Sequence, residues 1–210
     1  SLASSACIFA RYATRLHDAL GVEHFSLLAV TAVACLTAAN AFGLQAGTTM
    51  QKLLTAAKVL GLLGLVALGF LSPVALEMSA PVSETPAPSN LQLAFILVLY
   101  TYGGWNVIVL VSGEIKDPHR NLVRALILGV ALITSIYLLT VFAFEYALGH
   151  ALLGSSQSAA SDIAAAVVGE FGAIFISILI CVTCLANINA TILTNSRIFY
   201  AFGQRWPSYR

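Results

Sequence analysis

Long apolar runs separated by short polar stretches make up most of this chain. Each run approaches or exceeds the ~20 residues that an α-helix needs to cross the hydrocarbon core of a bilayer. The predicted spans are residues 25–43, 53–71, 91–111, 122–148 and 171–202, preceded by a partial span over residues 1–20. We therefore predict an all-α, polytopic membrane helix bundle in which residues 1–210 form a single transmembrane region.

The stretches between these runs predict turns and loops. Residues 44–52 predict a short polar turn, and residues 72–90 hold four of the six prolines and predict an exposed loop. Residues 154–161 are rich in serine and predict another loop. After it, Ser161 or Asp162 is expected to cap a short helix over residues 163–168.

One apolar run contains a feature that weakens a helix. Gly103 and Gly104 lie at the middle of residues 91–111, and each costs a helix roughly 1 kcal/mol relative to alanine. In lipid, irregular backbone is tolerated only where it is buried in protein or lines a polar cavity. An interruption over residues 102–105 would present carbonyls that favour a cation and N–H groups that favour an anion. The alternative is that the glycines let a neighbouring helix pack closely.

Composition agrees with a membrane location. The chain is 59% hydrophobic and only 9% charged, whereas soluble domains carry about 25% charged residues. A net charge of +1 argues against a nucleic-acid surface. The four cysteines lie in apolar runs, where cysteine behaves as a small hydrophobe, and the four histidines show no ligand spacing. We expect no metal site and no cofactor.

Lys58 is the most informative single charge. It lies within a predicted span, where a charged side chain costs several kcal/mol and normally faces a cavity or a partner. The alternative is that its long stem reaches the headgroups, since Lys58 is only about two turns from the end of that span.

Other polar side chains are candidates for the same site. On the last span, Cys184, Asn187, Thr191 and Thr194 follow helical spacing and form one small, polar stripe; hydrogen bonding between packed helices is an equal alternative for each. Tyr102 and Trp105 flank the paired glycines, where they either wall a substrate cavity or act as bulky packing.

Two strings of residues resemble a known family. Residues 100–106 read YTYGGWN, and residues 114–125 read EIKDPHRNLVRA. Together they resemble the amino acid–polyamine–organocation permeases, which show a glycine–tryptophan pair in the sixth helix followed by E-[IV]-K-x-P-x-R-N-[LI]-P-R-A. This chain departs from that pattern at Gly113, where the family often has an acid, and at Val123, where it usually has proline.

Two further strings extend the resemblance over essentially the whole chain. Residues 53–63, LLTAAKVLGLL, resemble the family's fifth helix, and residues 187–201, NINATILTNSRIFYA, resemble its eighth. The resemblance implies a partial LeuT-like fold running from the end of helix 3 to helix 8, with a discontinuous helix near residues 102–105. It also implies that the chain is a piece of a longer permease, without the first helix that supplies the other half of the substrate site.

The resemblance assigns roles to the candidate residues. Tyr102, Gly103, Gly104 and Trp105 would bind substrate. Lys58 would place its ammonium where sodium-coupled relatives hold sodium, near Cys184, Asn187 and Thr191, and a lysine there would load and release a proton. Glu114 would act as a cytoplasmic gate, with a plain solvated loop charge as the alternative.

Basic residues support the orientation that the family implies. In that topology seven basic residues lie on the cytoplasmic side, and only Arg11 and Arg15 lie outside, the bias that the positive-inside rule requires. The seven are Lys52, Lys116, Arg120, Arg124, Arg197, Arg205 and Arg210.

The function that the resemblance implies is alternating-access transport of an amino acid or related amine across the plasma membrane. Proton coupling and exchange both stay open, so the expected partners are the substrate, the lipid bilayer and, in the first case, protons. The alternatives are an integral-membrane enzyme, for which no His, Asp or Ser cluster is apparent, and a non-transporting scaffold, against which the glycine pair argues.

Overall fold

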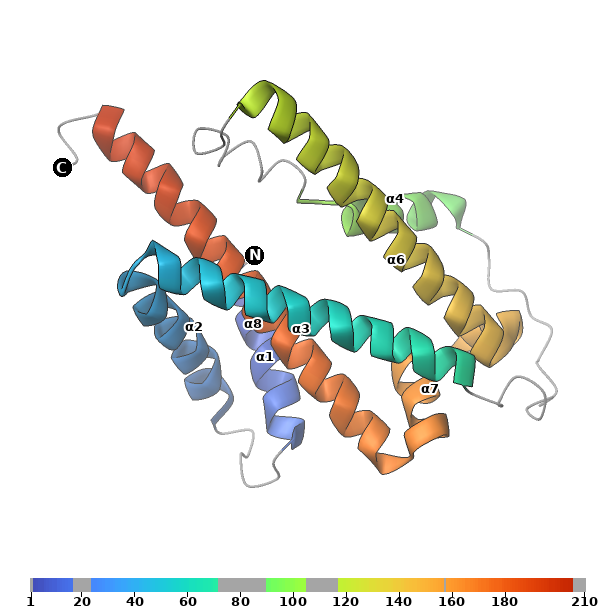
Figure 1. The fold of residues 1–210 in the computed structure, drawn as a ribbon. Helices are drawn as coiled ribbons and strands as arrows, with labels where there is room; N and C mark the ends of the chain where they lie inside the picture. The colour runs from blue at the N-terminus through green and yellow to red at the C-terminus, as the bar shows by residue number, and fades with distance from the viewer. Residues whose placement is uncertain (1, 17–23, 72–89, 105–116, 157, 206–210) are drawn as a thin grey trace. The chain divides into compact units, whose positions relative to one another are not determined.

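The computed structural model describes residues 2–16, 24–71, 90–104, 117–156 and 158–205. Within these ranges the regular structure is helical, without a β-strand. The helices are α1 (Leu2–Leu16), α2 (Phe25–Ala41), α3 (Leu44–Leu71), α4 (Leu91–Thr101), α6 (Pro118–Ser155), α7 (Ala159–Val168) and α8 (Glu170–Arg205) (Figure 1). The all-α prediction is confirmed.

The chain divides into two compact units. The first comprises residues 1–78 and 136–196, and therefore holds α1, α2, α3, α7, the second part of α6 and most of α8. The second comprises residues 79–135 and 197–210, and holds α4, the first part of α6 and the end of α8.

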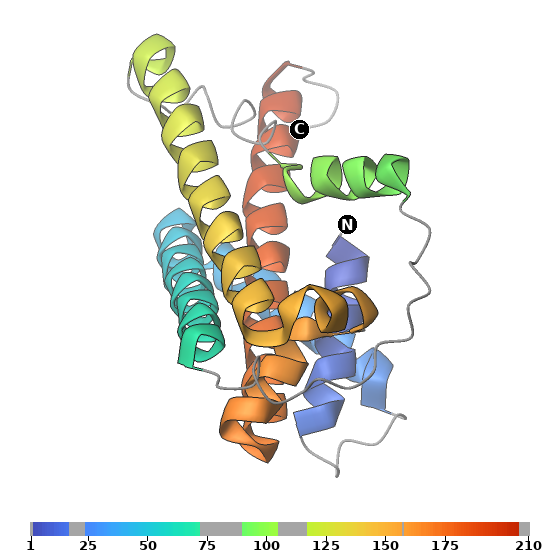
Figure 2. The same cartoon turned by 90° about the vertical axis from the view of Figure 1, so that its right-hand side faces the viewer.

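In the first unit, α8 packs against α1, α2, α3 and α7 (Figures 1 and 2). At one point Ile188 of α8 is fully buried against Ala6 of α1 and Leu36 of α2. Further along, Ile176 of α8 packs with Leu65 of α3 and Ala164 of α7. This core therefore consists of contacts between helices rather than one central cluster.

Small residues set the closest approaches in this unit. A Cβ atom at Gly172 of α8 would overlap the backbone of Ala164 in α7. A Cβ atom at Gly69 of α3 would lie 3.1 Å from the carbonyl oxygen of Ala143 in α6. Glycine and alanine at such positions let membrane helices approach until their backbones touch, which supplies dispersion energy in the absence of a hydrophobic drive.

The predicted polar turn over residues 44–52 is wrong. α2 ends at Ala41, and Gly43 has a φ of +133°, a conformation that glycine adopts without strain. α3 then begins directly at Leu44. Its polar first turns are stabilised because Gly47 and Gln51 both accept hydrogen bonds from Asn189 of α8, a tertiary contact that local polarity does not reveal.

The predicted serine-rich loop over residues 154–161 is too long. α6 continues to Ser155, with a break in helical geometry at Gly149, and α7 begins at Ala159. Neither Ser161 nor Asp162 is the cap; Ser158 precedes the helix, and its carbonyl accepts from the N–H groups of both residues at 2.9 and 3.1 Å. The short helix itself is confirmed.

In the second unit, the starts of α4 and α6 are both specified locally. The side chain of Asn90 caps α4 by accepting from the Leu93 N–H at 3.1 Å. α6 begins at Pro118 rather than at the predicted residue 122, because proline has a φ suited to the first helical position and has no N–H to leave unpaired. Its first turn closes on the carbonyl of Asp117, which accepts from Arg120 and Asn121.

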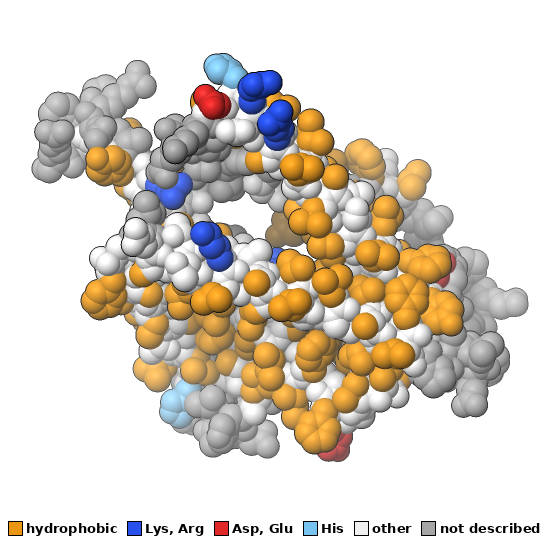
Figure 3. Space-filling model, viewed as in Figure 1, with side chains coloured by type: hydrophobic (Ala, Val, Ile, Leu, Met, Phe, Trp, Pro, Cys, Tyr) orange, Lys and Arg blue, Asp and Glu red, His pale blue; other side chains and the backbone are white. Residues whose placement is uncertain are grey.

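Within the part of the chain that the structure describes, three helices are long and apolar enough to cross a membrane: Gln45–Leu71, Pro118–Gly149 and Glu170–Tyr200. α2 and α4 are shorter apolar helices, and the predicted continuation of α4 to residue 111 lies outside the described residues. Large apolar side chains cover the outer faces of α2 and α3, among them Val30, Leu53 and Leu60 (Figure 3). Exposed apolar surface on this scale identifies a membrane protein whose outer faces contact lipid.

Candidate functional site

The predicted break in the helix at residues 102–105 is confirmed up to Gly104. α4 ends at Thr101, and the N–H of Tyr102 donates to the Val98 carbonyl at 3.2 Å. The next N–H, of Gly103, donates instead to the carbonyl three residues earlier, that of Tyr100, at 3.1 Å. The helical i→i−4 pattern therefore ends here. Gly104 then has a φ of +103°, which a residue with a side chain rarely adopts.

The two glycines differ in what a side chain would meet. A Cβ atom at Gly103 would lie 3.1 Å from the Tyr100 carbonyl oxygen, whereas a Cβ atom at Gly104 would have nothing within 4 Å. Backbone conformation therefore requires glycine at position 104, and close packing of a neighbouring helix does not explain it among the described residues. Trp105 and Glu114 lie outside the described residues, so their predicted roles stay predictions.

Tyr102 is held by a side chain of the following helix. Its phenol oxygen lies 3.1 Å from Oγ1 of Thr134 in α6, and both side chains are partly buried. α4 itself has no buried residue over Leu91–Thr101, so this pair ties the end of an otherwise exposed helix to its neighbour. Thr134 was not among the candidate site residues predicted from the sequence.

Lys58 on α3 and Cys184 on α8 lie within electrostatic reach of each other. The cation-site role that the resemblance implies for them stays a prediction. Cys184 is buried, with 7% of its surface exposed. The Lys58 side chain is exposed, so the described helices do not themselves enclose its ammonium.

The rest of the polar stripe on α8 makes structural hydrogen bonds. Asn187 donates from Nδ2 to Oγ of Ser5 in α1 at 2.9 Å, which is the packing alternative for this residue. Thr191 donates from Oγ1 to the Asn187 carbonyl at 2.8 Å within the same helix.

A buried amide cluster was missed by the sequence analysis. Asn189 of α8 has no exposed surface. Its Nδ2 donates to the Gly47 carbonyl at 3.2 Å and to Gln51 Oε1 at 2.8 Å. Its Oδ1 accepts from Asn40 Nδ2 at 2.7 Å. The cluster therefore joins α2, α3 and α8 through one side chain.

Local fit explains the composition of this cluster. Asn40 also donates to the Leu36 carbonyl of its own helix at 2.7 Å. The Asn40 amide oxygen occupies the space that a Cβ atom at Gly47 would take. An asparagine within an apolar run is the signal that would have found Asn40 and Asn189, but sequence spacing does not show that they are partners.

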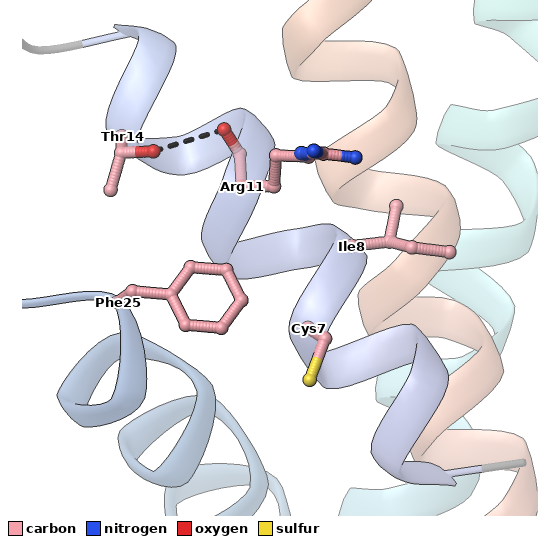
Figure 4. Close-up of a pocket in the computed structure, with 5 residues that line it drawn as sticks. All are labelled: Cys7, Ile8, Arg11, Thr14 and Phe25. Atoms are coloured by element: carbon pink, nitrogen blue, oxygen red, sulfur yellow. Dashed lines mark hydrogen bonds between the residues drawn. The ribbon is translucent and has the colours of Figure 1, made fainter. Parts of the chain in front are cut away.

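A cavity of about 500 Å³ lies between α1 and the start of α2. It is lined by Cys7, Ile8, Arg11, Thr14 and Phe25, and the hydroxyl of Thr14 donates to the Arg11 carbonyl at 3.0 Å (Figure 4). None of these residues was predicted to bind substrate. Among the described residues, no group of three or more His, Cys, Asp or Glu side chains is placed to hold a metal ion.

Comparison with known proteins gives a consistent result. The family described as "Amino acid permease" matches residues 1–205. The serine/threonine exchanger SteT of Bacillus subtilis is 27% identical over 180 residues, which are 85% of this chain and 41% of that protein. The mouse large neutral amino acids transporter small subunit 2 is 27% identical over 182 residues, 83% of this chain and 34% of that protein.

The mouse Asc-type amino acid transporter 1 is 26% identical over 182 residues, again 83% of this chain and 34% of that protein. The chain thus spans between about a third and two fifths of the length of these curated relatives.

The amide cluster generates a first prediction. Replacing Asn189 by Leu removes three hydrogen bonds and leaves Asn40 and Gln51 without their partner. Hydrogen bonds between membrane helices contribute about 0.6 kcal/mol each on average, so we expect a loss of roughly 2 kcal/mol. Thermal unfolding of the detergent-solubilised full-length protein, followed by size-exclusion chromatography, measures this loss.

The matched control is Asn195→Leu, an exposed asparagine on the same helix. We expect its unfolding midpoint to stay within error of the wild type. Equal midpoints for the two variants would show that the cluster does not hold the three helices together.

Proposed function

This chain belongs to the amino acid permease family, and we propose that the whole protein moves an amino acid or a related amine across the plasma membrane by alternating access. The observation that carries this proposal is the end of the apolar helix α4 at Thr101, followed by a turn through Tyr102–Gly104 within the apolar run of residues 91–111. Backbone groups without helical partners at a helix break can bind the charged ends of a small zwitterion. Unpaired carbonyls favour its ammonium, and unpaired N–H groups favour its carboxylate.

The comparisons support an amino acid as the substrate class. By their names, the relatives are a serine/threonine exchanger, a transporter of large neutral amino acids and an Asc-type amino acid transporter. Membership of a permease family favours transport over the membrane-enzyme alternative. The interrupted helix favours transport over a scaffold, because a scaffold gains nothing from the cost of two adjacent glycines at mid-span.

Lys58 supports a cation role in the transport cycle. Its ammonium lies near Cys184 of α8, the helix on which the resemblance places the cation site. We propose that it stands in for a bound cation and exchanges a proton during the cycle. The proposal requires the Lys58 side chain, which the described helices leave exposed, to be enclosed in the whole protein.

An uptake assay tests the function. The full-length protein is reconstituted in liposomes and offered each of the 20 L-amino acids, with empty liposomes as the control. We expect time-dependent accumulation of at least one neutral amino acid, because the described site has no fixed acid to select a basic substrate. Uptake equal to that of empty liposomes for all 20 compounds, and for a panel of simple amines, would reject transport.

The paired glycines generate a prediction about uptake. Gly104→Leu places a side chain at a φ of +103°, so the backbone must leave the conformation that forms the break. We expect uptake to fall at least 100-fold at unchanged membrane insertion, because a shift of about 3 kcal/mol in the site geometry has that effect.

Gly129→Leu is the matched control, because Gly129 lies in helical α6 and a Cβ atom there has nothing within 4 Å. We expect this variant to transport normally. Normal uptake by Gly104→Leu would mean that transport does not need the backbone conformation at this position.

Lys58 generates a prediction about coupling. Lys58→Met keeps an unbranched side chain one atom shorter and removes its charge, so the site can no longer load and release a proton. Accumulation driven by a pH gradient should fall to the level reached without a gradient. Lys52→Met, an exposed lysine on the same helix, is the control. Unchanged gradient-driven accumulation in Lys58→Met would reject the coupling role of Lys58 and assign proton coupling to another group.

A further inference from the structure

We propose that Thr134 is a positioning residue, whose hydroxyl fixes the phenol of Tyr102 and thereby the end of α4 at the helix break. This inference rests on the proposed function, because the break matters for transport only if it forms the substrate site. The carrying observation is the 3.1 Å contact between Tyr102 Oη and Thr134 Oγ1, two residues separated by 32 positions along the chain.

The hydroxyl of Thr134 differs from those of its neighbours. On the same helix, Ser135 donates to the Ala131 carbonyl and Thr140 to the Ile136 carbonyl, each at 2.8 Å. Such bonds within one helix are the usual solution for a hydroxyl in lipid. Among the described residues, Thr134 makes no bond of this kind and instead accepts from Tyr102. Its hydroxyl is therefore used between helices.

Thr134 lies near the middle of the apolar span of α6. It is 16 residues beyond Pro118, the first residue of α6, which corresponds to ~24 Å of helix, and the span runs to Gly149. A hydrogen bond between side chains in this region supplies a partner that lipid cannot offer.

The Tyr102–Thr134 hydrogen bond also fixes the exposed C-terminal end of α4. None of the residues Leu91–Thr101 is buried, and the backbone after Thr101 changes from α-geometry to a turn. Without an anchor the last turn of α4 would fray, since its carbonyls have lost their helical donors. Anchoring Tyr102 keeps the carbonyls of this turn in one place, which lowers the entropy that substrate binding must remove.

Hydrogen–deuterium exchange on the full-length protein in nanodiscs tests the anchor directly. Thr134→Val removes the hydroxyl at nearly constant shape, and Tyr102→Phe removes the partner hydroxyl. We expect each to speed exchange of the amides in residues 97–104 about threefold, as expected for one interhelical hydrogen bond in a membrane. The double variant should exchange no faster than either single variant, because both remove the same contact.

Two controls separate positioning from general damage. Thr134→Ser keeps the hydroxyl and should exchange like the wild type. Ser135→Ala removes the neighbouring hydroxyl, which bonds within its own helix, and should also leave residues 97–104 unchanged. Wild-type exchange rates in Thr134→Val, or additive effects in the double variant, would overturn the proposal.

Transport kinetics then connect the anchor to the site. For the L-amino acid that gives the largest uptake in the wild type, Thr134→Val should raise KM about threefold at an unchanged maximal rate, and Thr134→Ser should restore it. An unchanged KM in Thr134→Val, in a wild type that transports, would overturn the link to the site. A wild type that transports none of the 20 compounds would instead reject the proposed function, and the exchange rates would still decide the anchor.

Discussion

Every backbone N–H and C=O group inside a bilayer needs a partner within the protein, and the structure of this chain follows from that constraint. α3, α6 and α8 satisfy it along their apolar segments by continuous helical hydrogen bonding. Where the ladder stops, as at Thr101, the chain exposes polar groups that lipid cannot satisfy. The stop at Tyr102–Gly104 is therefore the place where a polar ligand is expected rather than an irregularity of the fold.

The same constraint governs the polar side chains. Most serines and threonines within the helices donate to a carbonyl one turn earlier, as Ser177 and Thr194 do at 2.8 and 2.9 Å. Other polar side chains form hydrogen bonds between helices. Asn189 joins α8 to α2 and α3, Asn187 joins α8 to α1, and Tyr102 joins α4 to α6. In lipid these few bonds, together with close glycine contacts, supply the specificity that a hydrophobic core supplies in water.

The polar side chains of α8 have partners on different neighbouring helices. Asn187 and Asn189 are two residues apart and point to different neighbours, α1 for the first and α2 and α3 for the second. Cys184, on the same helix, is a buried thiol within electrostatic reach of Lys58. A polar residue on this helix is therefore not evidence of a transport site by itself, and its partner decides its role.

The sequence by itself determined the helical class, the membrane location and the family, because these depend on the length and apolarity of runs and on local strings such as YTYGGWN. It also determined the break at Gly103 and Gly104, since glycine acts through its own backbone. The pairing of Asn40 with Asn189, the helical start of α3 at Leu44 and the anchoring of Tyr102 by Thr134 were decided only by the tertiary structure. The physical reason is that each depends on a partner far along the chain, and the periodicity of one helix shows which face is polar but not which helix meets that face.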